Sequence, residues 1–276
     1  MHLVSRTVWS LVGWMACLAA VVNAAGVLEI DVVFPRNNGT YAPSKFFPIV
    51  FALQNGNLAK HLAPAIYSFI RNGSNLESTF GQSSRDLTYA NYSSEPYFVW
   101  NLEDIDAEGR YQLLATAAWQ SCNVSGDQVS IGGGDINFGV TFIIKKGGQE
   151  VDLRAAPAGL VAATADDKTC SAKHGVALNV TGQTYEVPAS LDSRKLSGTC
   201  GVLASSSPTP TANPCRVKID TAVAASMSAF LHASMCKGIN PPADCPKENA
   251  VQQLAVAGVT SFAGVFGALG FLLASL

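Results

Sequence analysis

The acidic segment 104–109 is the part of the chain that comes nearest to a metal-binding motif. The carboxylates of Asp104, Asp106 and Glu108 stand at positions 1, 3 and 5 of this segment, and a glycine follows at position 6. This is the opening of an EF-hand calcium loop, whose position 12 must supply a bidentate glutamate. Position 12 is Ala115 here. We therefore predict a solvated turn leading into the next strand, with a weaker calcium site completed by distant oxygens as the alternative.

The other residues able to do chemistry are isolated from one another. After residue 24 the chain has three histidines, His61, His174 and His232, and none of them has a carboxylate or a second histidine at metal-ligand spacing. The run Gly132–Asp135 is predicted to be a turn between strands, because no helix follows it as a phosphate-binding loop requires. No catalytic residue, metal site or cofactor site is predicted, and the protein is expected not to be an enzyme. Folding could still bring two carboxylates to glycosidase spacing without any trace in the sequence.

A cluster of aromatic residues offers a second kind of site, a platform for sugar rings. It comprises Tyr89, Tyr92, Tyr97, Phe98, Trp100 and Trp119. Because these residues lie on predicted strands, packing in the core is the favoured interpretation.

Six cysteines follow the N-terminal segment, and an even number in an exported chain predicts three disulfides. They are Cys122, Cys170, Cys200, Cys215, Cys236 and Cys245. The pairing is open among about 15 combinations. The local pair Cys236–Cys245, across the Pro241-Pro242 turn, is the easiest to draw.

The N-terminus predicts a signal peptide over residues 1–24. Arg6 supplies the positive charge, Val8–Val22 is a short apolar stretch, and small residues precede a cleavage site after Ala24. An N-terminal membrane anchor is the alternative, but the stretch is short for a bilayer span.

The C-terminus predicts a GPI-attachment signal. Leu254–Leu276 is apolar and uncharged, and no basic residue follows it to hold a cytoplasmic side. Attachment at Ala243 would discard Cys245 and leave an odd number of cysteines, so Asn249 is the favoured attachment residue, with residues 250–276 as the propeptide. The expected location is the outer face of the plasma membrane or the cell wall, reached by the secretory pathway.

Five sequons with no internal proline predict a glycosylated surface. They begin at Asn38, Asn72, Asn91, Asn123 and Asn179. The net charge of −2 gives no basic field for binding nucleic acid.

From Val27 to about Lys146 the chain reads as strand after strand, with no helical pattern between them, and the pattern weakens from Glu150 to Val202. This predicts a β-sandwich domain over residues 25–202. In the first strand, Leu28, Ile30, Val32 and Phe34 alternate with Glu29, Asp31 and Val33, so one face is expected to be buried. Phe46–Leu53 predicts a buried strand with an edge or a bulge at Pro48. A glycine two residues before Tyr111 is similar to the tyrosine corner of immunoglobulin-like sandwiches, although Leu113 stands where antibody domains have cysteine.

The C-terminal part has a different pattern. Val176–Val180 and Gln183–Val187 predict a strand pair turned by Thr181-Gly182. Residues 203–214, rich in Ser, Thr and Pro, predict a linker. In the segment 215–249, apolar residues at three-to-four spacing predict one helix from Thr221 to Met235, capped by Asp220 and docked on the β domain.

Three segments carry a resemblance to a known family: Gly26–Pro35 (GVLEIDVVFP), Phe47–Asn55 (FPIVFALQN) and Asn213–Asp220 (NPCRVKID). Together they resemble an uncharacterised family of secreted, GPI-anchored ascomycete fungal cell-surface proteins. The resemblance implies a fungal cell surface and transfers no catalytic residue.

The expected fold is therefore mainly β: an immunoglobulin-like sandwich with a disulfide-tied C-terminal extension that contains one short helix. The expected function is structural or adhesive, with a carbohydrate-binding or carbohydrate-active wall protein as the alternative. The expected partners are the membrane, through the GPI lipid, and cell-wall polysaccharide or another surface protein.

Overall fold

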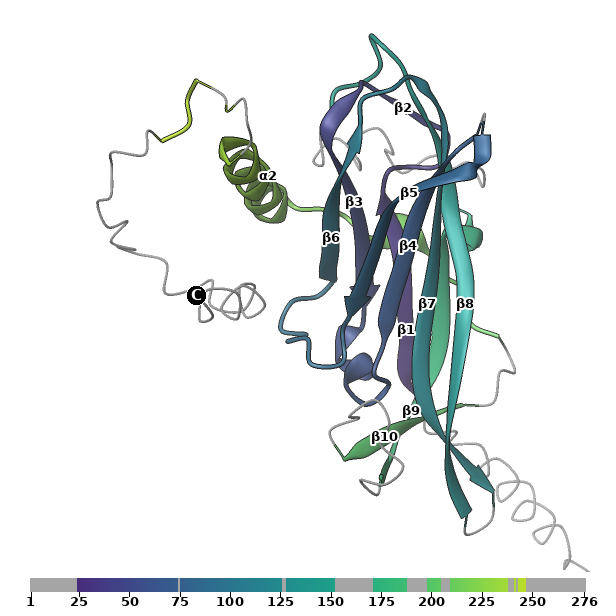
Figure 1. The fold of residues 1–276 in the computed structure, drawn as a ribbon. Coiled ribbons are helices and arrows are strands. Elements are labelled where there is room, and N and C mark those ends of the chain that lie inside the picture. Colours follow the sequence, from purple (N-terminus) through teal and green to yellow (C-terminus); the bar gives the residue numbers. More distant parts are fainter. Residues whose placement is uncertain are drawn as a thin grey trace, which may run out of the picture.

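The computed structural model describes residues 24–73, 75–125, 128–151, 171–187, 198–204, 209–237, 241 and 243–246. The described chain is mainly β, as predicted (Figure 1). Its strands are β1 (Ala24–Phe34), β2 (Gly39–Tyr41), β3 (Ser44–Gln54), β4 (Ala65–Asn72), β5 (Asn75–Asp86), β6 (Tyr97–Ile105), β7 (Gly109–Ser125), β8 (Gln128–Ile144), β9 (Gly175–Glu186) and β10 (Thr199–Leu203). Its helices are the 3-10 turns η1 (Gly56–His61), η2 (Ala172–His174) and η3 (Pro214–Arg216) and the α-helix α2 (Thr221–Cys236).

The strands form one open, mixed sheet with the order β2-β8-β7-β10-β9-β1-β3-β6, while β5 pairs with β4 and β4 pairs with β7. The pairings β2–β8 and β10–β7 are parallel, and the others are antiparallel. The two ends of this path face each other across the core. Phe47 of β3 stacks on Phe142 of β8 with ring centroids 5.3 Å apart, and Phe51 contacts Phe138 edge-on at 6.2 Å.

The proline of β3 lies where that strand becomes an edge. β1 pairs with β3 only as far as Phe34↔Val50, so Pro48 has a partner strand on one side alone, through Leu102 of β6. A proline has no N–H to donate and is tolerated at such a position. The expectation of an edge at Pro48 is confirmed.

The glycine run is not a turn, contrary to prediction. Gly132–Asp135 lies inside β8, paired with β7. A Cβ on Gly134 would meet the Trp119 ring at 2.6 Å. The glycines therefore remain in a strand because their missing side chains make room for residues of β7.

The predicted hairpin at Thr181-Gly182 is also wrong. Residues 175–186 form the single strand β9. Its first half pairs with β1, and its second half pairs with β10. Two partners in succession keep the chain extended through Thr181-Gly182.

After β10, residues 209–237 form what we call the C-terminal arm. It contains η3 and α2, and Figure 1 shows α2 beside β6. The predicted helix is confirmed, and the Asp220 carboxylate caps it by accepting a hydrogen bond from the Val223 N–H at 2.8 Å. Ala224 and Met227 are buried, and Phe230 packs edge-on against Trp100 of β6 at 4.5 Å. No helix among the described residues has the length and apolar character to cross a bilayer.

Two disulfides are defined by the described residues. Cys122 of β7 is joined to Cys200 of β10, and Cys236 at the end of α2 is joined to Cys245. The second is the local pair drawn from the sequence. Cys215 is also disulfide-bonded, while Cys170 lies outside the described residues.

Candidate functional site

The polar residues of β1 are buried, in addition to the apolar face for which the sequence predicts burial. Glu29 is 5% exposed and Asp31 is fully buried. They point to the face opposite Leu28 and Ile30, because side chains alternate along a strand. The predicted burial of the Leu28 and Ile30 face is confirmed. The second face is buried as well, because β1 lies between β3 and β9 and the C-terminal arm covers it.

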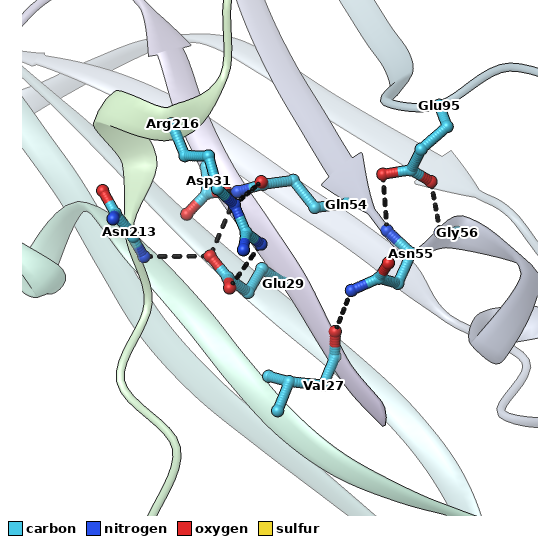
Figure 2. Close-up of polar contacts among 9 residues, drawn as sticks. All are labelled: Val27, Glu29, Asp31, Gln54, Asn55, Gly56, Glu95, Asn213 and Arg216. Atoms are coloured by element: carbon cyan, nitrogen blue, oxygen red, sulfur yellow. Dashed lines mark hydrogen bonds and ion pairs between the residues drawn. The ribbon is translucent and has the colours of Figure 1, made fainter. Parts of the chain in front are cut away.

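Glu29, Gln54 and Arg216 form a closed ring of hydrogen bonds (Figure 2). The Arg216 guanidinium donates through Nη2 to Glu29 Oε1 at 2.9 Å and through Nε to Gln54 Oε1 at 2.6 Å. The Gln54 amide donates in turn to Glu29 Oε2 at 3.1 Å and to Asp31 Oδ2 at 2.7 Å. The backbone N–H of Asn213 completes the contacts of Glu29 at 2.9 Å. We call these five residues the carboxylate cluster.

Asp31 is the member of the cluster with the poorest solvation. Its Oδ1 atom has no hydrogen-bond partner among the described residues. Gly175 of β9 lies directly opposite, and a Cβ placed on it would lie 2.1 Å from Asp31 Oδ1 and 3.2 Å from Ala212 Cβ. Burial raises the pKa of Asp31 to about 7, against the lowering effect of the hydrogen bond from Gln54.

Ionisable groups within the cluster and next to it shift the pKa of Asp31. Glu29 raises the pKa of Asp31 further, while Arg216 and Arg36 lower it. Arg36 is partly buried, which lowers its pKa, and its Nε is buried with no partner among the described residues. Burial together with Arg36 lowers the pKa of His174, whose Nδ1 lies 2.9 Å from the Gly139 carbonyl oxygen.

The chemistry open to this cluster is limited by its enclosure. Two carboxylates joined by one amide could act as an acid and a base only if a substrate reached them. Here Arg216 and Asn213 of the arm occupy that side of Glu29, and Ala212 lies beside Asp31. The arrangement fits an attachment point for the arm.

The loop after β3 has a separate polar contact (Figure 2). The carboxylate of Glu95 accepts hydrogen bonds from the N–H groups of Asn55 at 2.8 Å and Gly56 at 3.2 Å. The Asn55 side chain donates to the Val27 carbonyl at 2.7 Å. Asn55 has a φ of 57°, a left-handed conformation that asparagine tolerates better than most residues.

The residues of the carboxylate cluster are far apart in the sequence, and no local motif marks them. The three segments that carry the family resemblance are nevertheless the three that supply them: Glu29 and Asp31, then Gln54, then Asn213 and Arg216. That coincidence is the signal from which the cluster could have been found.

The EF-hand-like segment is a solvated turn, as favoured from the sequence. β6 ends at Ile105 and β7 begins at Gly109. Asp104, Asp106 and Glu108 are exposed, and Glu108 accepts a hydrogen bond from the Lys146 N–H at 2.6 Å.

The histidines have structural partners that the sequence did not indicate. His61 Nδ1 lies 2.8 Å from the Thr199 hydroxyl, and His232 Nε2 lies 2.9 Å from Asp244 Oδ2. His232 is also close to Cys236 and Cys245, which is a ligand set by proximity. Because these two cysteines form a disulfide, they do not offer the thiolates that a metal site needs.

The six aromatic residues do not share one exposed surface. Tyr92 is buried, donates its hydroxyl hydrogen to the Leu87 carbonyl at 2.7 Å and contacts Tyr97. Trp100 lies against Phe230 of the arm. Within this set, only the Tyr89 side chain is largely exposed, at 67%.

The predicted modification sites are distributed over the surface of the described part. Asn38, Asn91 and Asn123 are exposed, and Asn72 and Asn179 are partly exposed. The signal peptide, apart from Ala24 at the start of β1, and the GPI signal, with Asn249, lie outside the described residues.

Comparison with known proteins places the chain in a family. No curated protein matches the chain. The matching family model carries the description "Domain of unknown function (DUF7136)" and aligns with residues 23–245, from the start of β1 to Cys245. The chain therefore belongs to the DUF7136 family.

Proposed function

We propose that this chain is an exported, N-glycosylated fungal cell-surface protein, held to the membrane by a GPI lipid, with a structural or adhesive role. The observation that carries the proposal is the Cys122–Cys200 disulfide, whose two residues are buried and which ties β7 to β10. Disulfides of this kind form and persist in oxidising compartments. The exposed sequon asparagines Asn38, Asn91 and Asn123 support the same location.

We further propose that the ectodomain is an immunoglobulin-like sandwich and not an enzyme. The Tyr111 hydroxyl donates to the Ala107 carbonyl at 2.8 Å, which is the hydrogen bond expected of a tyrosine corner. Enclosure of Glu29 and Asp31 under the arm supports a non-enzymatic role for the carboxylates.

The location is tested on the full chain expressed in a fungal host. The protein should remain on the cell until a phosphatidylinositol-specific phospholipase is added, and the released material should lose mass when N-glycans are removed. Non-reducing peptide mapping should recover Cys122 linked to Cys200. Retention in the cytosol with free thiols would contradict the proposal.

Carbohydrate binding is a second candidate function, favoured by the outer face of β4, β7 and β8. Tyr67 is 43% exposed there and lies in register with Thr116 and Asn137 on the neighbouring strands. The Thr116 hydroxyl donates to Asn137 Oδ1 at 2.6 Å. An exposed ring beside hydroxyl and amide groups suits a sugar ring, which presents an apolar face and a polar edge.

A glycan array and sedimentation with insoluble wall polysaccharide test this second candidate. Tyr67→Ala should abolish saturable binding. Tyr89→Ala should leave binding unchanged, because Tyr89 lies outside the strands of this face, and its greater exposure makes it a stringent control. Equal loss in both variants, or no binding by the unaltered protein, would rule the face out. Release of soluble sugars would instead make the protein an enzyme.

A further inference from the structure

The C-terminal arm covers the outer face of the sheet from β9 to β6. Ala212 lies by Gly175 of β9, Arg216 binds Glu29 of β1 and Gln54 of β3, and Phe230 packs on Trp100 of β6. Along the arm, Ala212, Val217, Ile219 and Met227 are buried. The polar attachment of this cover is therefore concentrated in the carboxylate cluster.

Of the two carboxylates in the cluster, only Glu29 has hydrogen-bond donors for both of its oxygens within the described part of the chain. Glu29 receives Arg216, Asn213 and Gln54, whereas Asp31 receives only the Gln54 amide, and its second oxygen is buried without a partner among the described residues. A buried charge that lacks hydrogen bonds is costly, and a neutral carboxyl in the same place is less so. A docked arm therefore favours the protonated form of Asp31.

We propose that the C-terminal arm is a proton-dependent latch, which docks with the Asp31 carboxyl neutral and is released from the outer face of β1, β3 and β6 as this carboxyl ionises.

The groups that act on Asp31 decide the direction of the latch. Glu29 on the same strand opposes ionisation, and Arg36 and Arg216 favour it, while β3 and β9 contribute the neutral Gln54 and Gly175. Desolvation is the largest of these effects and raises the pKa of Asp31 to about 7. With the arm lifted, water reaches the carboxylate, and its pKa returns toward the ordinary value of 3.8.

Proton linkage gives the size of the effect. The docked arm holds a proton that the released arm loses between about pH 4 and pH 7, so docking weakens as the pH rises through that range. The pKa values of Asp31 in the docked and released states differ by about three units, which limits the total change in the docking constant to about a thousandfold. Release would uncover Trp100 and Phe98, which lie on the covered face.

Amide hydrogen exchange on the full-length protein tests the latch. Exchange is followed from pH 5 to pH 8, with labelling times scaled for the intrinsic pH dependence of the amides. Peptides covering 217–229 report on the arm, and peptides of the paired strands β4 and β7 serve as the internal reference. The opening constant of the arm should rise at least tenfold from pH 5 to pH 8, and at each pH it should exceed the opening constant of the reference strands, which distinguishes release of the arm from global unfolding.

Two variants locate the group responsible. Asp31→Asn should make the opening of the arm independent of pH in this range, and Asp135→Asn, an exposed residue of β8, should behave as the unaltered protein. If Asp31→Asn fails to fold, the amides of β4 and β7 will lose their protection from exchange. The pH profile of the unaltered protein is then the test of the proposal. A flat pH profile for its arm, or an unchanged profile in folded Asp31→Asn, would overturn the proposal.

Discussion

Breaking the ring around Glu29 should destabilise the fold by a predictable amount. Arg216→Met keeps a long apolar side chain but removes both donated bonds, to Glu29 at 2.9 Å and to Gln54 at 2.6 Å. Hydrogen bonds to charged groups contribute about 1.5–3 kcal/mol, and loss of a partner leaves Glu29 buried. The Arg216 side chain is 55% exposed, so solvent screens its charge. We expect a loss of about 2 kcal/mol in unfolding free energy.

A double-mutant cycle separates the contact itself from other effects of the substitution. Glu29→Gln, Arg216→Met and the double variant are unfolded in urea at pH 5, where the arm is docked, with circular dichroism as the readout. The coupling energy should be about 1 kcal/mol or more, above the ~0.5 kcal/mol found for independent sites. Lys218→Met, an exposed change two residues along the arm, should alter stability by less than about 0.5 kcal/mol. Additive effects of the two single substitutions would refute the ring as a source of stability.

Three further substitutions test other parts of the account, each by urea unfolding. Met227→Ala should cost about 2 kcal/mol, because Met227 is buried between α2 and the sheet, and no measurable cost would mean that the arm is undocked. Gly134→Val should lower the unfolding free energy by about 1–3 kcal/mol, because the Trp119 ring would lie 2.6 Å from the new Cβ. The same change should alter tryptophan fluorescence, and an unchanged spectrum would argue against this packing. Tyr111→Phe should cost about 1 kcal/mol through loss of the bond to Ala107, and a neutral effect would remove support for a tyrosine corner.

Strand content was predictable from the sequence because alternation and turn residues are local signals. The α2 helix was predictable for the same reason: its cap at Asp220 and its apolar spacing stand within one segment. The Cys236–Cys245 bridge joins residues only nine positions apart, which chain proximity favours.

The failures concern positions where a distant segment decides the environment. Gly134 reads as a turn residue, but Trp119 on the facing strand occupies the space beside it. Thr181-Gly182 reads as a hairpin turn, but pairing with β1 and then with β10 holds β9 extended. In both cases, tertiary contacts override local preference.

The carboxylate cluster shows the same limit for the candidate site. Alternation predicts burial for one face of β1 and leaves the surroundings of Glu29 and Asp31 open, since nothing nearby in the sequence indicates a cover. Their burial depends on Arg216, which is 187 residues away from Glu29 in the chain. A single sequence indicates alternation within β1 but not which segment lies over it.

Enclosure of the carboxylate cluster by the C-terminal arm is the central claim, and the titration of Asp31 tests it most directly. Carbon-13 NMR of side-chain carboxyls, assigned by the signal that disappears in Asp31→Asn, follows this group through pH. We predict a midpoint near pH 7, the pKa of about 7 that burial gives Asp31, with unfolding free energy decreasing as the pH rises from about 4 to 7. A midpoint for Asp31 near the ordinary 3.8 would show that water reaches the carboxylate and that the arm does not seal this face.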